Sequence, residues 1–134
     1  MAPELEQFDP IGEIYLALGK KDEPYFRLVN EFYAGVEKNE ILRPLYPEDL
    51  QMPKEHLALF LIQRTGGPQT YSLNRGHPRM RARHMPFKIA TKERDAWIDE
   101  MTVALNAVPE FASHKAALME FFEGFATFLI NSPD

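Results

Sequence analysis

Apolar residues recur every three or four positions along most of this 134-residue chain. That spacing is the repeat of an α-helix that buries one face, and it limits the possible folds more than any other feature. We find no stretch with the apolar–polar alternation of a half-buried strand. The sequence therefore predicts an all-α protein, and its length suits one domain spanning residues 1–134.

About five helices are expected: over residues 11–19, after Asp22, from Pro53 to about residue 65, from Thr91 onward and over residues 109–131. Asp22 is expected to cap the second helix, because short acidic side chains commonly accept hydrogen bonds from the first turn. Gly66-Gly67-Pro68 is expected to end the third helix. The last helix, rich in phenylalanine, is expected to supply core and pocket floor.

One segment breaks the helical pattern: GGPQTYSLNRGHPRMRARHMPF, residues 66–87. It holds three prolines and a double glycine, so it cannot form one long regular helix. It also holds two of the four histidines and four arginines. Irregular segments of this kind form either surface linkers or the walls of a site.

Composition removes several classes of function. The net charge of −5 argues against a general nucleic-acid binder, and the absence of cysteine excludes disulfides and thiolate metal sites. No apolar run approaches the length of a membrane-spanning helix. The first ten residues lack the apolar core of a signal peptide, so a cytoplasmic location is expected.

The histidines favour a haem site over a zinc site. A zinc site needs three or four protein ligands, and Pro78 breaks any regular helix between His77 and His84. Haem needs one neutral imidazole, an apolar slot and cations for its propionates. RMRARHMPF offers these groups together, with His84 next to Arg83. Taken alone, a single histidine is more commonly a surface or hydrogen-bonded residue.

Three blocks of the chain carry a resemblance to a known family. They are FYAGVEKNEILRPLYPEDL, GGPQTYSLNRGHPRMRARHMPFKI and ERDAWIDEM, in that order. Together they resemble the truncated haemoglobins of group II, over about residues 11–131. The resemblance implies a two-over-two helical sandwich in which the proximal helix is reduced to a loop and a short turn. The irregular segment is then the wall of a site.

The resemblance also implies the proximal residues. His84 corresponds to the proximal iron ligand of haem b (iron protoporphyrin IX). Arg83, Tyr71 and His56 correspond to propionate-binding positions. His77 is interpreted as structural, and the arginines at positions 75 and 79 as a solvated basic face.

On the distal side, the resemblance makes Tyr33, Tyr46 and Trp97 the groups that face a bound ligand, with the Tyr33 hydroxyl and the Trp97 indole N–H as donors. Pro53 falls at the gate position, where it has no hydrogen bond to offer. The expected haem-pocket residues are Phe32, Pro53, Leu57, Phe60, Leu61, Met85, Phe87 and Met101.

The expected function is reversible binding of O₂, with CO and NO as further ligands. Storage, oxygen transport, sensing, nitric oxide oxidation and peroxidase-like chemistry stay open, and turnover would require an electron-donating reductase. Group II relatives are often dimeric, so a homodimer is an open expectation. The alternative is a non-haem helical module that binds a small molecule or a partner helix.

Overall fold

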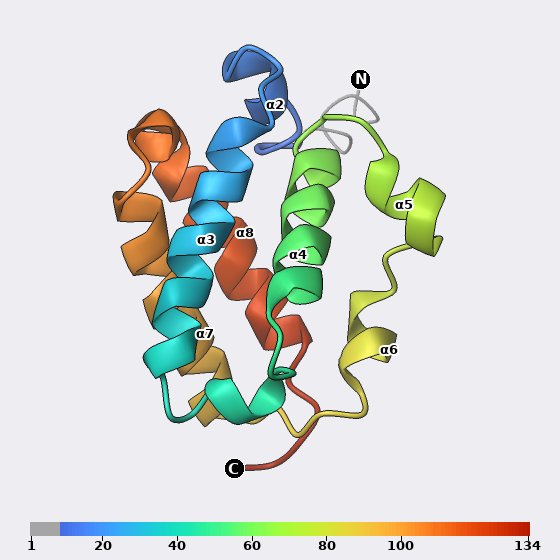
Figure 1. The fold of residues 1–134 in the computed structure, drawn as a ribbon, viewed down its shortest axis with the longest axis vertical. Helices are drawn as coiled ribbons and strands as arrows, with labels where there is room; N and C mark the ends of the chain where they lie inside the picture. The colour runs from blue at the N-terminus through green and yellow to red at the C-terminus, as the bar shows by residue number, and fades with distance from the viewer. Residues whose placement is uncertain (1–8) are drawn as a thin grey trace, which may run out of the picture.

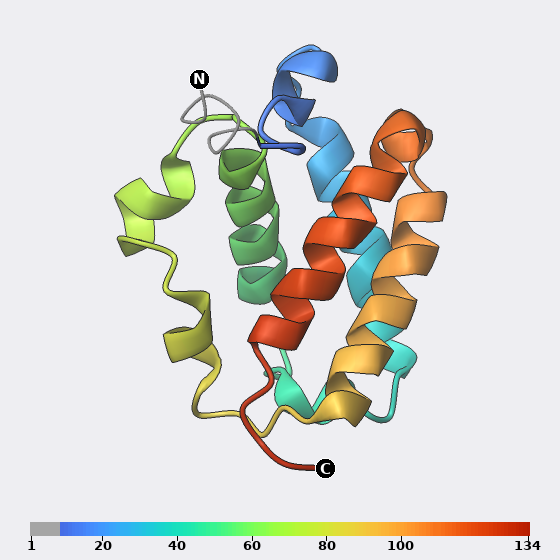
Figure 2. The same ribbon diagram turned by 180° about the vertical axis from the view of Figure 1, so that it is seen from behind.

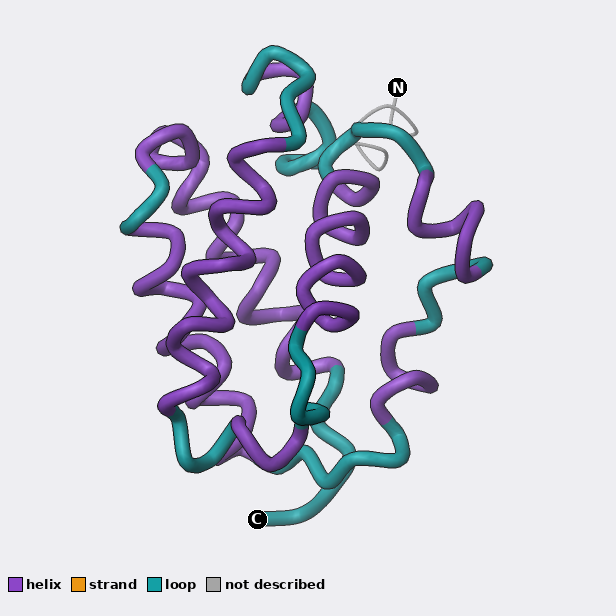
Figure 3. The backbone as a smooth tube through the Cα atoms, viewed as in Figure 1, coloured by secondary structure: helices purple, strands orange, loops and turns teal. Residues whose placement is uncertain are grey.

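The computed structural model describes residues 9–134, and within that range every regular element is helical, as predicted. The polypeptide path is shown in Figures 1 and 3. The α-helices are α2 (Ile14–Ala17), α3 (Glu23–Lys38), α4 (Gln51–Arg64), α5 (Thr70–Arg75), α6 (Met80–His84), α7 (Thr91–Asn106) and α8 (Lys115–Phe128); the 3₁₀ helices are η1 (Arg43–Leu45) and η2 (Pro109–His114).

Four long helices build the body of the molecule. Helix α3 packs against both α4 and α7, and α7 packs against α8. The pair α3–α4 lies over the pair α7–α8, as the opposed views of Figures 1 and 2 show. This is the predicted two-over-two arrangement. Across residues 9–134, no helix is long and apolar enough to cross a membrane.

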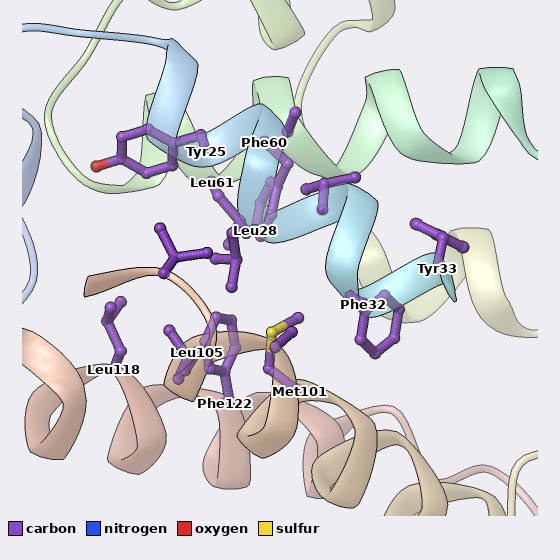
Figure 4. Close-up of a cluster of buried hydrophobic side chains, with 14 of the residues drawn as sticks. Tyr25, Leu28, Phe32, Tyr33, Phe60, Leu61, Met101, Leu105, Leu118 and Phe122 are labelled. Carbon is purple, nitrogen blue, oxygen red and sulfur yellow. The ribbon is translucent and has the colours of Figure 1, made fainter. Parts of the chain in front are cut away.

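The apolar faces of the four long helices meet in one core. Figure 4 shows Phe32 from α3, Met101 from α7 and Phe122 from α8 in the cluster of buried side chains between these helices. Phe32 and Met101 are fully buried, and Phe122 is 1% exposed. Burial of a side chain of this size stabilises a fold by about 1.5–3 kcal/mol. The helical spacing of these residues is therefore explained by the core that they fill.

A buried polar contact ties α3 to the end of α4. The hydroxyls of Tyr25 and Thr65 are 2.6 Å apart, and the Thr65 hydroxyl also lies 2.8 Å from the Leu61 carbonyl oxygen, to which it donates. Directly after it, Gly66 has φ +99°, and a Cβ there would lie 2.2 Å from the Gly12 carbonyl oxygen. Only glycine fits this position, so the predicted end of the helix is confirmed.

The prediction of one helix over residues 109–131 is wrong. The chain forms η2 first and α8 only from Lys115. At the junction His114 has φ −110° and ψ 2°, outside the α-helical region, and the hydrogen bonds of the α-helix are interrupted there. The apolar spacing continues through the break, which is why the pattern alone did not reveal it.

Two predicted helix starts also need correction. Asp22 precedes α3 but makes no capping hydrogen bond; its carboxylate accepts a hydrogen bond of 2.8 Å from the Tyr15 hydroxyl instead. Helix α4 begins at Gln51, two residues before Pro53. Proline within a first turn costs no helical hydrogen bond, so Pro53 does not have to mark the first residue.

The irregular segment contains two short helices that the sequence did not predict separately. Helix α5 packs against α4. Helix α6 has only five residues and follows the left-handed residue Arg79, with φ 44°. Both lie outside the four-helix body, along the side of α4 (Figure 1). The segment therefore forms one outer wall of the molecule, and the space behind this wall is the site.

Candidate functional site

A cavity of about 420 Å³ lies behind the irregular segment, a volume typical of small-molecule pockets. Its walls come from helices α3 to α8, from η1 and from the loops beside them. Eleven of the fifteen predicted site residues line it: Tyr33, Tyr46, Pro53, His56, Leu57, Phe60, Tyr71, Arg83, His84, Phe87 and Trp97. The structure thus brings together residues that are up to 64 positions apart in the chain.

His84 is the last residue of α6, and its ring orientation is fixed by its own helix. Its Nδ1 atom lies 2.6 Å from the Met80 carbonyl oxygen. A carbonyl can only accept, so Nδ1 carries the proton and Nε2 of the neutral ring keeps its lone pair. A hydrogen bond of this kind orients the histidine ligands of metals. In its neutral form, His84 therefore has Nε2 free to act as a ligand.

The chain that follows His84 is held by Asn131, beyond the end of α8. The Asn131 side-chain amide donates to the carbonyl oxygens of His84 at 3.1 Å and Phe87 at 2.8 Å. Its side-chain oxygen accepts from the Ile89 N–H at 3.0 Å, and its backbone N–H donates to the Ile89 carbonyl at 2.9 Å. Sequence reasoning missed Asn131, because no motif links positions more than 40 residues apart.

The chain beyond Asn131 also contacts Thr91, the first residue of α7. The Asp134 carboxylate accepts hydrogen bonds from the Thr91 N–H at 2.9 Å and the Thr91 hydroxyl at 3.1 Å. These bonds hold the pKa of Asp134 below its ordinary value. Residues 131–134, which we call the tail, therefore run beside residues 84–91 and bond to them at both ends.

The three side chains that the resemblance assigned to the distal side, those of Tyr33, Tyr46 and Trp97, all line the cavity. The rings of Tyr33 and Tyr46 meet edge to face, with centres 5.4 Å apart. Burial raises the pKa of Tyr46 to about 12, and hydrogen bonding with Tyr33 and Trp97 opposes part of that rise. Burial also raises the pKa of Tyr33 well above its ordinary value. Both hydroxyls are therefore protonated at neutral pH and can donate hydrogen bonds.

Phe32 supports this cluster from behind, and does not line the cavity. Its ring centre is 5.0 Å from that of Tyr33 and 5.1 Å from that of Trp97. Phe32 was predicted to line the pocket, but it lies in the core behind the lining residues. Phe32 holds two of the three distal side chains in place.

Leu61, Met101 and Met85 also lie outside the lining. Leu61 is 2% exposed and Met101 is fully buried between the long helices. Met85 is 55% exposed and lies next to Arg81, whose guanidinium is 3.3 Å from its sulfur. Met85 follows α6 on its outer side, so proximity to His84 in sequence does not bring it inward.

Several residues that line the cavity were not predicted from the sequence. Phe125, Ala126 and Leu129 of α8 and its C-cap confirm the expectation that the last helix supplies the floor. Their helical spacing was the available signal. The others include Leu42, Leu45, Met80, Ile89 and Arg94. Leu42 and Ile89 are buried loop residues, whose direction the helical periodicity does not give.

Cationic groups gather around Tyr71 at one side of the cavity. The guanidinium groups of Arg75 and Arg83 each lie 5.7 Å from the centre of the Tyr71 ring. Arg75 also contacts the His56 ring. Burial and the positive charge of Arg75 lower the pKa of His56. The interpretation of Arg75 as part of a solvated face is wrong, because its side chain is half-buried against these two rings.

Arg75 has one buried polar atom, Nε, without a hydrogen-bond partner among residues 9–134. Such groups are rare in folded proteins, and a charged one is costly to leave unpaired. An anionic group at this place would satisfy it.

Arg83 uses much of its hydrogen-bonding capacity on the backbone. Its Nε donates to the Pro78 carbonyl at 2.6 Å, and its Nη2 donates to the Arg75 carbonyl at 2.7 Å. These bonds fix the connection between α5 and α6. Arg83 therefore lines the cavity and also holds the histidine-bearing helix in place.

The residues present fit a haem. The cavity walls are largely apolar and aromatic, one imidazole nitrogen is available at His84, and an unpaired arginine nitrogen lies among cations that suit propionates. Within residues 9–134, no cluster of three or more His, Asp or Glu could hold a metal ion by itself.

Comparison with known proteins agrees with this geometry. The sequence model of the bacterial-like globin family matches residues 13–131. A curated relative, group 2 truncated hemoglobin YjbI of Bacillus subtilis, is 39% identical over 94 residues, which cover 70% of each chain.

Two solved structures superpose closely. Hemoglobin from the phototrophic bacterium Chloroflexus aurantiacus has a TM-score of 0.84 at 44% identity, covering 89% of this chain and 98% of that one. The truncated oxygen-avid haemoglobin of Bacillus subtilis has a TM-score of 0.83 at 34% identity, covering 89% of this chain and 99% of that one. Sequence, fold and pocket agree, and the chain belongs to the truncated haemoglobins of group II, a family of haem-binding globins.

Proposed function

We propose that this protein holds haem b through His84 and binds O₂ and other diatomic ligands in the space beside Tyr33, Tyr46 and Trp97. When bound, the haem supplies an iron that binds the ligand. The observation that carries the proposal is the His84 ring, whose Nδ1–H is committed to Met80 and whose other nitrogen remains available. The Bacillus subtilis structure described as oxygen-avid supports the choice of O₂.

The distal residues act as hydrogen-bond donors toward the ligand. Tyr33 and Tyr46 keep their protons at neutral pH, and the indole of Trp97 is a donor only. A neutral hydrogen bond contributes about 0.5–1.5 kcal/mol, and more when its acceptor carries charge. Because about 1.4 kcal/mol corresponds to a tenfold change in the dissociation rate, two such donors slow the loss of ligand by one to several orders of magnitude.

Slow release favours chemistry on the ligand over oxygen transport. Nitric oxide oxidation and peroxide reduction are the reactions that such a site suits, and both require an outside electron donor. The donor set Tyr33, Tyr46 and Trp97 is the observation that favours this second function. Pro53 adds no donor of its own at the cavity wall.

The cationic groups around Tyr71 are assigned to binding of the haem propionates. Arg75 offers its unpaired Nε, and His56 and Tyr71 lie in contact with the same arginine. The lowered pKa of His56 keeps it neutral at pH 7, so it serves as a hydrogen-bonding group there and Arg75 supplies the charge. Arg83 acts mainly by holding the α5–α6 connection.

The test compares two histidine variants after reconstitution with hemin, reduction and exposure to CO. His84→Ala is expected to lose the sharp Soret band of the CO form or to bind hemin weakly. His77→Ala is the control, because His77 is exposed on the same segment. Recovery of the His84→Gly band by added imidazole would confirm that the ring supplies the ligand. A His84→Ala spectrum equal to that of the wild type rejects the assignment.

The alternative function makes a different prediction in the same experiment. A non-haem pocket or interaction module would give a colourless protein that takes up no added hemin. That result would leave the fold intact and reject haem binding.

A further inference from the structure

The charges of this acidic protein are distributed unevenly along the chain. Residues 56–92 contain seven of the 15 basic residues and none of the 20 acidic ones. The rest of the chain therefore carries eight basic residues against 20 acidic ones. This basic segment starts within α4 and continues through α5, α6 and the loop up to α7, so it includes the outer wall of the haem pocket.

Apart from the half-buried Arg83, the basic residues nearest to His84 in sequence lie at the surface, although Arg81 also donates a hydrogen bond of 3.2 Å to the Ile130 carbonyl. Arg79, Arg81 and Lys88 are all exposed. Within residues 9–134 none of the three takes part in an ion pair, whereas Arg27 and Arg64 do pair with carboxylates. Their charges are therefore not neutralised by this part of the chain.

Apolar side chains lie among these charges. Met85 is 55% exposed and Phe87 is 44% exposed. Phe87 also lines the cavity, so it connects the outer surface to the pocket. An apolar centre with a rim of one charge is the usual composition of a surface that recognises a protein of opposite charge.

We propose that this face, defined by Arg79, Arg81, Met85, Phe87 and Lys88, docks an acidic electron-transfer protein that reduces the haem iron. The inference rests on the proposed function, which requires an electron donor for repeated turnover. One electron passes from the reduced partner to ferric haem, which becomes ferrous; the partner is oxidised by one electron, and no bond forms or breaks.

The position of the face favours a redox partner over other acidic surfaces. The exposed basic residues lie in α6 or within four residues of its ends, so a partner docked there would lie beside the helix that carries the proposed iron ligand. A nucleic acid or an anionic membrane would gain nothing from that position. The face is also small and carries few charges, which suits a short-lived protein complex more than a polyanion.

The test uses paired charge reversals. Arg79→Glu with Lys88→Glu changes the face, and Lys20→Glu with Lys21→Glu makes the same change in charge at the α2–α3 connection. Both pairs are exposed, and each contains one residue with positive φ, Arg79 at 44° and Lys20 at 58°. Backbone strain is therefore matched between the two variants.

The probe is flavodoxin, a small acidic flavoprotein. Calorimetry measures its binding in the oxidised form to the haem-loaded protein at about 0.01 M and about 1 M salt, where charges are screened beyond about 30 Å and 3 Å. Stopped-flow absorbance measures reduction of the ferric protein by reduced flavodoxin and, separately, by dithionite.

The face variant is expected to bind flavodoxin at least tenfold more weakly at low salt and to be reduced by it correspondingly more slowly. Its reduction by dithionite and its CO spectrum should match the wild type. The control variant should change by less than twofold, and 1 M salt should remove the difference. Electrostatic steering commonly changes association rates by about 10- to 1000-fold.

Equal behaviour of the face and control variants overturns the proposal. So does a wild-type protein that binds phosphatidylserine vesicles or single-stranded DNA through these residues more tightly than flavodoxin. A salt-sensitive dimer, lost only in the face variant, would assign the face to a second copy of the chain. Each of these results leaves the proposed function standing if the CO spectrum is normal, whereas loss of haem binding by the wild type rejects that function itself.

Discussion

Replacing Asn131 by alanine should loosen the chain around the proximal histidine. Besides a local hydrogen bond accepted from the adjacent Ser132 hydroxyl, the change removes three side-chain hydrogen bonds to residues 84–89: to the His84 carbonyl, the Phe87 carbonyl and the Ile89 N–H. At about 0.5–1.5 kcal/mol each, their loss would cost about 1.5–4.5 kcal/mol. Asn131 is half-buried, so water replaces part of them, and we expect a loss of about 1.5–3 kcal/mol.

Urea unfolding of the haem-free protein measures this loss directly, and hydrogen exchange of residues 84–90 measures it locally. Asn131→Asp keeps the acceptor for Ile89 but places a carboxylate oxygen against the His84 and Phe87 carbonyl oxygens, so it should destabilise the protein at least as much as alanine. Asn30→Ala is the control, because Asn30 is exposed on α3 and makes no side-chain hydrogen bond within residues 9–134. An Asn131→Ala protein within 0.5 kcal/mol of wild type, with unchanged exchange, would refute the reasoning.

Three further perturbations test the pocket and the core. Tyr33→Phe and Trp97→Phe should each raise the O₂ dissociation rate about 2- to 10-fold in flash photolysis, from about 0.5–1.5 kcal/mol per donor; unchanged rates in both would contradict the distal assignment. Arg75→Met should speed haem transfer to an apomyoglobin acceptor by about tenfold, since it removes the half-buried guanidinium but keeps an apolar stem; the same change at the exposed Arg79 should not. Burial raises the pKa of Tyr25 from 10.0 to about 12. Its contribution to the free energy of unfolding is therefore complete below pH 10 and is lost as the pH rises to 12. This amounts to about 2.7 kcal/mol at most, and urea unfolding of Tyr25→Phe should show a correspondingly smaller loss over that pH range.

The sequence predicted the helical body because its signals are local. The steps of three and four along α3 and α7 and the double glycine after α4 each describe a few neighbouring residues. The break at His114 has no such signal, because the apolar spacing runs through it. Asp22 has the residue type of a cap, but the Tyr15 hydroxyl, seven residues away, competes for its carboxylate.

In the pocket, too, the sequence indicated residues that belong to local motifs but not contacts between distant residues. The resemblance gave His84, Tyr33, Tyr46 and Trp97, and the fold brings all four to one cavity. It did not give the burial of Arg75, since arginines in a polar, proline-rich stretch are usually solvated. Whether an arginine is buried depends on what packs over it, here the rings of His56 and Tyr71.

The tail imposes a fixed register on a segment that looks like an ordinary loop. Residues 85–90 have no regular secondary structure, and such connections usually tolerate insertions. Here Asn131 bonds to His84 at the start of the segment, and Asp134 bonds to Thr91 at its end. The number of residues between His84 and Thr91 is therefore fixed, as register is fixed between two paired strands. One inserted residue would either break a bond to the tail or rotate the histidine. Changes in length are therefore expected to be tolerated before α5, near residues 68–69, and not after α6.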